Sequence, residues 1–244
     1  MIVIDYNPLV IASYFRIDEG WRNIDSVSRE FFRRVEDIES KFETIYGKAI
    51  IVGDCGLSWR KQIYPAYKAN RAKDVDETWK EIGTILRELS SIVKSKFPFF
   101  EFESLEADDI IGWFARSAKK PMLIISSDRD FLQLQANEHV KQYSTIQGKW
   151  VITNNPKEAL LEKILRGDTS DNIPSITKEL YRLESDNTQK KTRAKPITKK
   201  FIEEFKKGVL YEKYKDRYEE NRRLIDLSLT PETLLNEFIQ KYKH

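Results

Sequence analysis

The chain has 244 residues, 40% of them hydrophobic, and a formal net charge of +3, which suits one large or two small domains with a buried core. No apolar run reaches the ~18 residues of a membrane span, and no signal sequence is recognisable at the N-terminus, so we expect a cytoplasmic protein without a membrane partner. One cysteine, Cys55, and two histidines, His139 and His244, argue against a Ser-His-Asp triad or a Cys-His nucleophile.

Strands and helices are predicted to alternate along the first half of the chain. Apolar runs predict strands at residues 1–6, 49–53, 99–102 and 122–125. Helical spacing predicts helices at 26–46, with Ser26 or Ser28 as its cap, at 78–94 and at 107–118. Segments 139–143 and 149–153, around Gly148, are typical of an edge hairpin, and the chain reads as helical from Pro156 onward. We therefore expect an α/β domain at 1–153, with a mostly parallel sheet flanked by helices, and a helical region at 154–244.

Carboxylates gather where the predicted strands end. Because the carboxyl ends of parallel strands form the ligand crevice of such sheets, we expect these side chains to lie together. There are nine of them: Asp5, Asp54, Glu106, Asp108, Asp109, Asp128, Asp130, Asp168 and Asp171. Taken singly, several have a structural explanation, since Asp128 or Asp130 could cap a helix and Glu106 or Asp109 could favour a helix dipole. Their recurrence at successive element ends favours a functional cluster.

Nine carboxylates cannot share one crevice unneutralised, so either several stay protonated or divalent cations lie between them. Oxygen ligands without thiolates or imidazoles select Mg²⁺ or Mn²⁺ over zinc, and two such ions assist an in-line phosphoryl displacement. We expect two Mg²⁺ ions, with Mn²⁺ as a substitute, and a metal-bound water as nucleophile.

The charge outside the cluster is basic. Without the nine acids, 42 Lys and Arg stand against 30 Asp and Glu, and 42 − 30 leaves +12. A basic surface around an acidic metal crevice suits an enzyme that acts on a polyanion. An ordinary mixed-charge surface is the alternative interpretation, and the charge balance alone favours it.

The order and spacing of the acidic motifs resemble the flap endonuclease and 5′→3′ exonuclease family over nearly the whole chain, and most closely the ribonucleases H of T-even bacteriophages. The segments that carry the resemblance include Gly53-Asp54, Ser58-Trp59-Arg60-Lys61, Glu106-Ala107-Asp108-Asp109, Ser127-Asp128-Arg129-Asp130 and Gly167-Asp168-Thr169-Ser170-Asp171. It implies a PIN-like fold and a phage-encoded, monomeric 5′ nuclease that binds RNA–DNA hybrids, 5′ flaps and nicked or gapped duplexes. It also implies a sliding clamp and a single-strand-binding protein as partners.

The resemblance further implies roles for individual residues. The first metal would lie among Asp5, Asp54, Glu106, Asp108 and Asp128, the second among Asp130, Asp168 and Asp171, with Asp109 supporting them from behind. Arg60 and Lys68 match a basic pair over the scissile phosphate, although both could be ordinary surface cations. Residues 60–79 would form an arch around a single strand, with Trp59, Lys61, Tyr64, Tyr67 and Arg71 as stacking and phosphate contacts. Trp59 and Tyr64 could equally close a core beneath the arch.

The sequence departs from the family after Ile173-Pro174. The family continues with a glycine-rich turn, whereas this chain has Ser175-Ile176-Thr177 and no glycine before Gly208, so a monovalent-ion site is not carried over. After an insertion at residues 178–195, of which 186–195 could be a disordered loop, we predict a helix that starts at Pro196 and binds duplex phosphates through Thr198, Lys199 and Lys200. Residues 187–207 contain eight Lys or Arg and two acids.

Three other classes fit less well. A haloacid-dehalogenase-type phosphatase needs a second carboxylate two residues after Asp5, where this chain has Asn7. A PIN-type ribonuclease shares the early acids but not the Gly-Asp-x-x-Asp element. A non-catalytic nucleic-acid-binding module has no use for intact acids, because unpaired carboxylates repel a polyanion.

Overall fold

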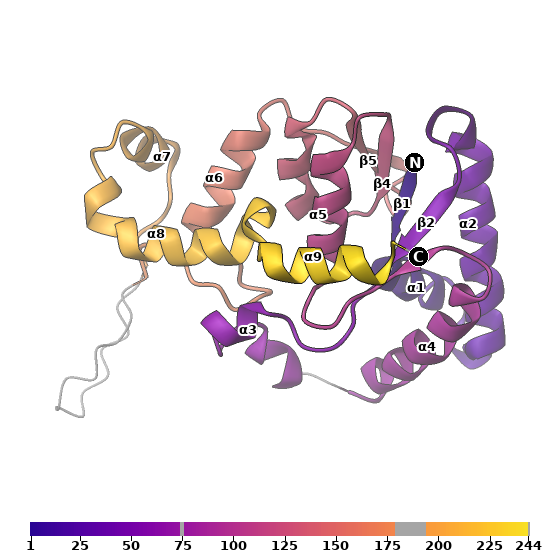
Figure 1. Cartoon of the computed structure of the whole chain (residues 1–244). Helices are drawn as coiled ribbons and strands as arrows, with labels where there is room; N and C mark the ends of the chain where they lie inside the picture. The colour runs from indigo at the N-terminus through magenta and orange to yellow at the C-terminus, as the bar shows by residue number, and fades with distance from the viewer. Residues whose placement is uncertain (74–75, 179–193, 244) are drawn as a thin grey trace.

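The computed structural model describes residues 1–73, 76–178 and 194–243. Its centre is a six-stranded sheet in the order β3-β2-β1-β4-β5-β6 (Figure 1). The strands are β1 (Ile2–Asp5), β2 (Ala49–Val52), β3 (Phe99–Phe100), β4 (Met122–Ile125), β5 (Val140–Ser144) and β6 (Lys149–Val151). All neighbouring strands are parallel except β5 and β6, which pair antiparallel. This arrangement confirms the mostly parallel sheet and the edge hairpin.

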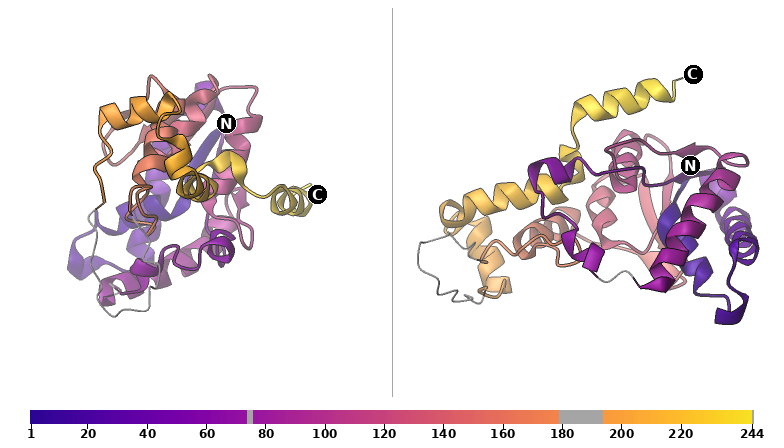
Figure 2. Two further views of the ribbon diagram at one scale, coloured as in Figure 1. Left: turned by 90° about the vertical axis from the view of Figure 1, so that its left-hand side faces the viewer. Right: turned by 90° about the horizontal axis from the view of Figure 1, so that it is seen from below.

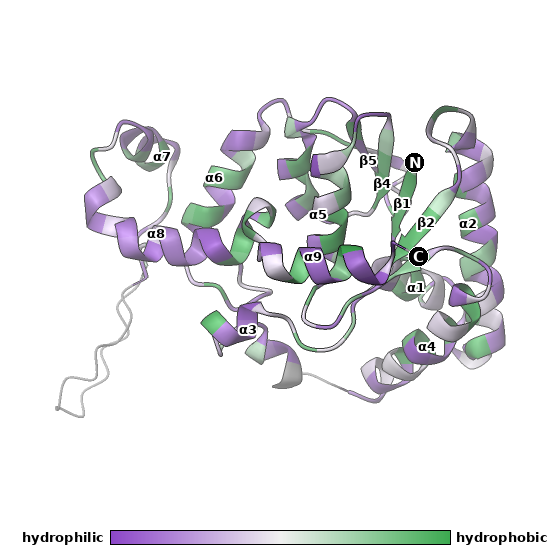
Figure 3. Cartoon of the chain, in the orientation of Figure 1, coloured by the Kyte–Doolittle hydropathy of each residue, from purple (hydrophilic) through white to green (hydrophobic). Residues whose placement is uncertain are grey.

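Helices cover both faces of the sheet, which explains why its central strands are continuous apolar runs. Ile2 and Ile4 face a core formed with α1 (Tyr6–Tyr14), α2 (Ile24–Tyr46) and α4 (Glu77–Lys94). Val3 faces the opposite core, to which α5 (Ala107–Ser117), the 3₁₀ helix η3 (Arg129–Ala136) and α9 (Glu232–Lys241) contribute. Figure 3 shows the central strands β1, β2 and β4 in hydrophobic colours.

Helix α1 was not predicted. It begins at Tyr6, directly after β1, so the expected strand end at Tyr6 is wrong. Leu9, Val10 and Tyr14 are buried, and the helix is mostly apolar, with no polar face to give it a helical period. The prediction of Ser26 or Ser28 as the cap of α2 is also wrong. Asn23 is the cap, and Ser26 completes a capping box with it.

The C-terminal helices gather at one end of the molecule, away from α2 and α4 (Figures 1 and 2). They are α6 (Pro156–Arg166), α7 (Lys199–Lys206) and α8 (Tyr211–Ile225), after which α9 returns to pack on the α5 side of the sheet. The predicted helix start at Pro196 is wrong, because Thr198 caps α7 and Lys199 is its first residue. Most of the segment at 178–195, and part of the basic stretch at 187–207, lie outside the described residues. None of the described helices is long and apolar enough to span a membrane.

Candidate metal centre

The predicted acids meet at the carboxyl edge of the sheet. Strand β1 lies between β2 and β4, so the chain turns to opposite sides of β1, and ligands bind at such a switch point. Asp5 ends β1, is 5% exposed and accepts a hydrogen bond from Ser126 Oγ at 3.0 Å. Asp54, just after β2, accepts the Ala107 N–H at 2.7 Å. That bond fixes the start of α5 against the end of β2.

Three carboxylates form the centre of the cluster. One oxygen from each of Asp108, Asp128 and Asp130 lies within 4.8 Å of the others. Asp128 also accepts the Asp130 N–H at 2.9 Å and so caps η3, which shows that a cap and a cluster acid can be the same residue. The oxygens are close enough to bind one divalent cation together.

The negative charges of the carboxylates in this cluster repel one another. Burial raises the pKa of Asp5 well above its ordinary value, and the neighbouring Asp54 and Asp128 raise it further. Partial burial, followed by the charges of Asp128 and Asp5, likewise raises the pKa of Asp108. Without a cation, the folded protein therefore holds these carboxylates at an electrostatic cost that a divalent ion would remove. The donor set fits such an ion.

The second group of acids is held by a lysine that sequence reasoning missed. Lys163, on α6, forms ion pairs with Asp130 and with Asp168, the latter at 2.8 Å. Asp168 also accepts bonds from the Ser170 N–H at 2.8 Å and the Ser170 hydroxyl at 2.6 Å. Asp108, Asp130, Asp168 and Lys163 line one small cavity, so the structure brings the two predicted groups of acids together.

We expect Lys163→Met to lower stability in a pH-dependent way. Burial raises the pKa of Asp168, but hydrogen bonds from Lys163 and Ser170 more than offset it and hold the pKa at about 2. The folded state thus favours the carboxylate, a stabilisation that is full above its ordinary pKa of 3.8 and is lost as the pH falls toward 2. Urea unfolding at neutral pH should show a loss of about 1–2 kcal/mol that shrinks below about pH 4.

Lys157→Met is the matched control, because Lys157 is an exposed lysine on the same helix. It should stay within about 0.5 kcal/mol of the parent. A pH-independent loss in Lys163→Met would show that lost packing, not the ion pair, is responsible.

Gly167 shapes the loop that presents Asp168. Its φ is +69°, and a Cβ there would lie 2.4 Å from the Ile173 carbonyl oxygen and 2.5 Å from that of Pro174. The loop is closed by two backbone bonds between Asp168 and Ile173, at 2.8 and 2.7 Å. The close approach of the Pro174 and Ile173 backbones therefore requires glycine.

We expect Gly167→Ala to destabilise the protein by about 2–3 kcal/mol, since it adds a backbone collision to the cost of a positive φ. Gly148→Ala measures the cost of the positive φ alone, because Gly148 has φ +63° with nothing within 4 Å of its Cβ position. That variant should lose about 1 kcal/mol in the same thermal unfolding experiment. Equal losses would contradict the collision.

Residues 67–71 of the predicted arch contact the acids. Lys68 forms an ion pair with Glu106, and its backbone N–H donates to the Asp171 carbonyl at 2.9 Å. Lys68 has φ 55°, a left-handed conformation that only surrounding contacts hold in place. Tyr67 donates to Glu106 at 2.9 Å and to Asp171 at 3.1 Å. Arg71, more than half exposed, pairs with Asp171 at 2.6 Å.

Two aromatic residues of this segment do not form a stacking surface. Trp59 is 6% and Tyr67 3% exposed, which corrects the expectation that they stack on bases. For Trp59 the structure selects the alternative, a core position. Tyr64 is half-buried and donates to the Asn172 carbonyl at 3.2 Å, while Lys61 is exposed.

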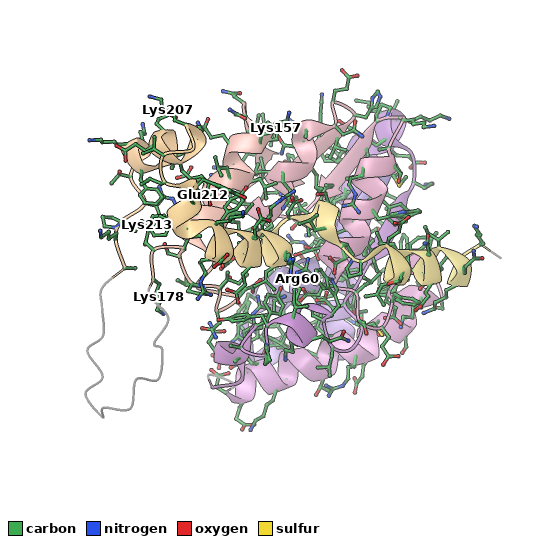
Figure 4. The ribbon with its side chains drawn as sticks, turned by 60° about the vertical axis from the view of Figure 1, so that its left-hand side comes forward. Arg60, Lys157, Lys178, Lys207, Glu212 and Lys213 are labelled. Atoms are coloured by element: carbon green, nitrogen blue, oxygen red, sulfur yellow. The ribbon has the colours of Figure 1, made fainter. Side chains whose placement is uncertain are left out.

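Arg60 is also buried. Its side chain is 2% exposed and pairs with Asp109 at 2.8 Å and with Glu106 at 2.9 Å. Its Nε donates to the Leu224 carbonyl at 2.7 Å. Asp109 is fully buried, and its carboxylate pairs with Arg60 and not with a metal-cluster residue. This geometry departs from the expectation that Arg60 contacts phosphate. In Figure 4 the label of Arg60 marks the place where the arch base meets α8.

Thr198, Lys199 and Lys200 are exposed at the start of α7, and the Thr198 hydroxyl accepts the Phe201 N–H at 3.2 Å. They lie in the helical end of the molecule, where Figure 4 labels Lys207 and Lys213. None of the three predicted duplex contacts touches the acid cluster.

Two family models match the chain. The one described as "5′-3′ exonuclease, N-terminal resolvase-like domain" matches residues 1–164. The chain belongs to the 5′-3′ exonuclease family. A second model, "T4 RNase H, C terminal", matches residues 155–244.

Relatives of this 5′-3′ exonuclease family member include the ribonuclease H of Enterobacteria phage T4, which is 28% identical over 90% of this chain and 78% of its own length. The 5′-3′ exonuclease of Buchnera aphidicola (Schizaphis graminum) is 29% identical over 73% of this chain and 66% of its own. DNA polymerase I of Borreliella burgdorferi is 37% identical over 49% of this chain, which spans only 14% of that polymerase.

The fold of the chain is also that of a solved phage enzyme. The flap endonuclease of bacteriophage T5, in a complex with DNA and metal ions, matches with a TM-score of 0.69 at 17% identity, over 98% of this chain and 96% of that one. The T5 5′-exonuclease with bound zinc matches with the same TM-score at 16% identity. These structures show a shared fold.

Proposed function

We propose that the chain is a Mg²⁺-dependent 5′ nuclease that hydrolyses phosphodiesters in RNA–DNA hybrids, at duplex 5′ ends and in 5′ flaps. The observation that carries this proposal is the group of Asp108, Asp128 and Asp130, whose oxygens lie within 4.8 Å of one another beside the arch lysine Lys68. The activities of the T4 ribonuclease H and the T5 flap endonuclease support the same reaction class. Both relatives come from phages, which supports a phage origin and action in the host cytoplasm.

Two divalent cations fit the acids. One would be held by Asp108 and Asp128 with Asp5, Asp54 and Glu106 around them, and the other by Asp130, Asp168 and Asp171. Bound there, such ions would activate water and neutralise charge on the phosphate. Oxygen-only donors favour Mg²⁺, with Mn²⁺ as a substitute. Lys163 would have to release Asp130 and Asp168 to make room for the second ion.

Lys68 is the protein's cation at the reacting phosphate in this proposal. Burial lowers its pKa, but Glu106 and Asp171 more than offset that effect and raise it, so the amine stays charged. Its side chain is 20% exposed and pairs with Glu106. A charged amine held there can stabilise negative charge that develops on the phosphate oxygens.

The substrate would span both parts of the molecule. A single strand would pass the exposed Lys61 and Arg71 with Tyr64, and the duplex would lie on Thr198, Lys199 and Lys200 at the start of α7. A sliding clamp and a single-strand-binding protein are proposed partners on the family resemblance.

Cleavage of 5′-labelled RNA–DNA hybrid and 5′-flap substrates tests the proposal directly. Mg²⁺ should release short 5′ products, and both EDTA and Asp130→Asn should prevent their release. Tight, salt-sensitive binding without any cleavage would overturn the nuclease proposal and favour a binding module with the same fold. Comparing the two substrates also shows whether RNA or DNA is preferred.

A further inference from the structure

A basic cavity of about 320 Å³ lies between α2 and the end of β5, which is within the size range of ligand sites. It shares no lining residue with the metal centre. The side chains that line it come from the segment after α1, from α2 and from β5 and its end: Arg16, Arg33, Arg34, Asp37, Ile38, Lys41, Phe42, Tyr143 and Thr145.

The charge of the α2–β5 cavity is unbalanced. Four cations line it, against the single acid Asp37, which is bonded to Arg33 at 2.6 Å. Glu30, just outside the lining, is shared among Arg33 at 2.8 Å, Arg16 at 3.6 Å and Arg34 at 4.0 Å. Counting both acids, the described part of the chain leaves two of these positive charges without a counter-charge.

Arg34 is the residue that points to a missing ligand. Its side chain is only 12% exposed, and its one direct hydrogen bond among the described residues goes to Thr145 Oγ1 at 3.2 Å. Its Nε has no acceptor among them. Burial lowers the pKa of this guanidinium, because a buried cation with so few acceptors is costly. The Nε is shielded from solvent, so a bound anion would supply an acceptor to the part of the side chain that is still exposed in the cavity.

The remaining walls suit a phosphate. Lys41 Nζ lies 4.4 Å above the Tyr143 ring and donates to its hydroxyl at 2.8 Å, so the ammonium is held in place. Guanidinium groups bind phosphate oxygens in paired hydrogen bonds. The exposed Arg16, at 69%, forms an open rim through which an anion can enter.

The cavity opens near the carboxyl edge that carries the metal centre. Thr145 follows the last residue of β5, and β5 pairs with β4, one strand spacing of about 4.8 Å away. Ser127 and Ser144 are joined by a 2.7 Å hydrogen bond between their hydroxyls, which ties the end of β5 to the segment that leads into Asp128. A strand bound at the acids would therefore pass close to this edge.

We propose that the α2–β5 cavity binds a phosphate group. The source of this phosphate group rests on the proposed nuclease function, in which the group belongs to the backbone of the bound nucleic-acid strand. A free phosphate or pyrophosphate presents the same chemistry. The site requires Arg34 with Lys41 and Arg16.

Calorimetric titration of the full chain with pyrophosphate in EDTA tests the cavity without the metals. Arg34→Gln should weaken binding at least tenfold, and Arg16→Gln, at an exposed position where folding is not at risk, should weaken it several-fold. Arg29→Gln is the matched control, because Arg29 is an exposed arginine of the same helix that does not line the cavity. It should bind like the parent.

The source of the phosphate follows from the salt dependence of 5′-flap binding, measured in an uncleaving Asp108→Asn background with Mg²⁺. The measured quantity is the slope of the logarithm of the binding constant against the logarithm of the salt concentration. If Arg16→Gln reduces the size of this slope by about 0.9, the cavity binds a backbone phosphate. If the slope is unchanged while pyrophosphate binding is lost, the cavity binds a free anion. Parent-like values in both experiments for Arg34→Gln and Arg16→Gln would overturn the site. If the parent binds pyrophosphate but cleaves no substrate, the phosphate site stands although the proposed nuclease function fails.

Discussion

Asp108→Asn should abolish Mg²⁺-dependent cleavage while making the metal-free protein more stable. Loss of one ligand from the central group removes several kcal/mol of charge stabilisation at the phosphate, and we expect kcat to fall at least about 10³-fold, or about 4 kcal/mol. Without metal, however, burial of the Asp108 carboxylate and repulsion from Asp128 and Asp5 raise its pKa, and the attraction of Lys68 does not offset them. A neutral amide removes that repulsion at nearly constant shape.

The gain in stability should depend on pH. Because the folded-state pKa of Asp108 is raised, the folded parent is favoured below the ordinary value of 3.8 and loses that advantage as the pH rises through the raised pKa. In EDTA, Tm of Asp108→Asn should match the parent near pH 4 and exceed it by about 2–4 °C at neutral pH, for about 1 kcal/mol. Mg²⁺ should raise the Tm of the parent more than that of the variant.

Asn7→Ala is the matched control, because Asn7 donates to Asp54 at 2.7 Å at the exposed edge of the cluster and carries no charge. It should show no pH-dependent gain in Tm. A variant at Asp108 that unfolds at lower temperature than the parent in EDTA would mean that this carboxylate supports the fold and that its loss of activity says nothing about metals.

The sheet and its acidic edge could be predicted because one physical rule governs both. A parallel strand buried on two faces must be apolar throughout, so a carboxylate such as Asp5 can stand only at its end. All strands that run this way end at the same edge. Chain order alone therefore brought Asp54, Asp108 and Asp128 together in the prediction, without any knowledge of side-chain geometry.

What the sequence could not reveal depends on partners that are far away along the chain. Lys163 is an ordinary amphipathic-helix lysine until Asp130, 33 residues earlier, lies against it. Asp109 bonds to Thr230 across 121 residues at 2.8 Å. The spacing of Lys163, five residues before Asp168, was the one available signal, since a helix that ends at Gly167 places its last turn next to the loop that follows.

Arg60 illustrates the same limit, because burial decides its role. In the sequence it stands among cations and aromatics and reads as a phosphate contact. In the structure its guanidinium joins α3 (Arg60–Ile63), α5 and the end of α8, through Asp109, Glu106 and the Leu224 carbonyl. The Trp59 indole adds an N–H bond to Asp109 at 3.1 Å. We therefore infer that Arg60 positions the base of the arch and Glu106, which in turn holds Lys68.

Arg60→Met should destabilise the protein by about 3–5 kcal/mol, because it leaves the Asp109 carboxylate buried without its cation. The expected fall in Tm is about 10 °C or more. Replacing both partners, as Arg60→Met with Asp109→Leu, should recover much of that loss, since an apolar pair needs no counter-charge. Lys68→Met should instead lose cleavage with a smaller loss of stability than Arg60→Met, because the Lys68 side chain is 20% exposed and that of Arg60 only 2%.

Urea unfolding and single-turnover cleavage of the four proteins separate the two roles. If Arg60 acts as a positioning residue, Arg60→Met should lose stability and activity together. The double variant should then regain more of its stability than of its activity. If Arg60→Met were as stable as the parent but as inactive as Lys68→Met, the guanidinium would have to leave Asp109 and reach the phosphate during the reaction. The arch base would then be a moving part, and the buried ion pair only its resting state.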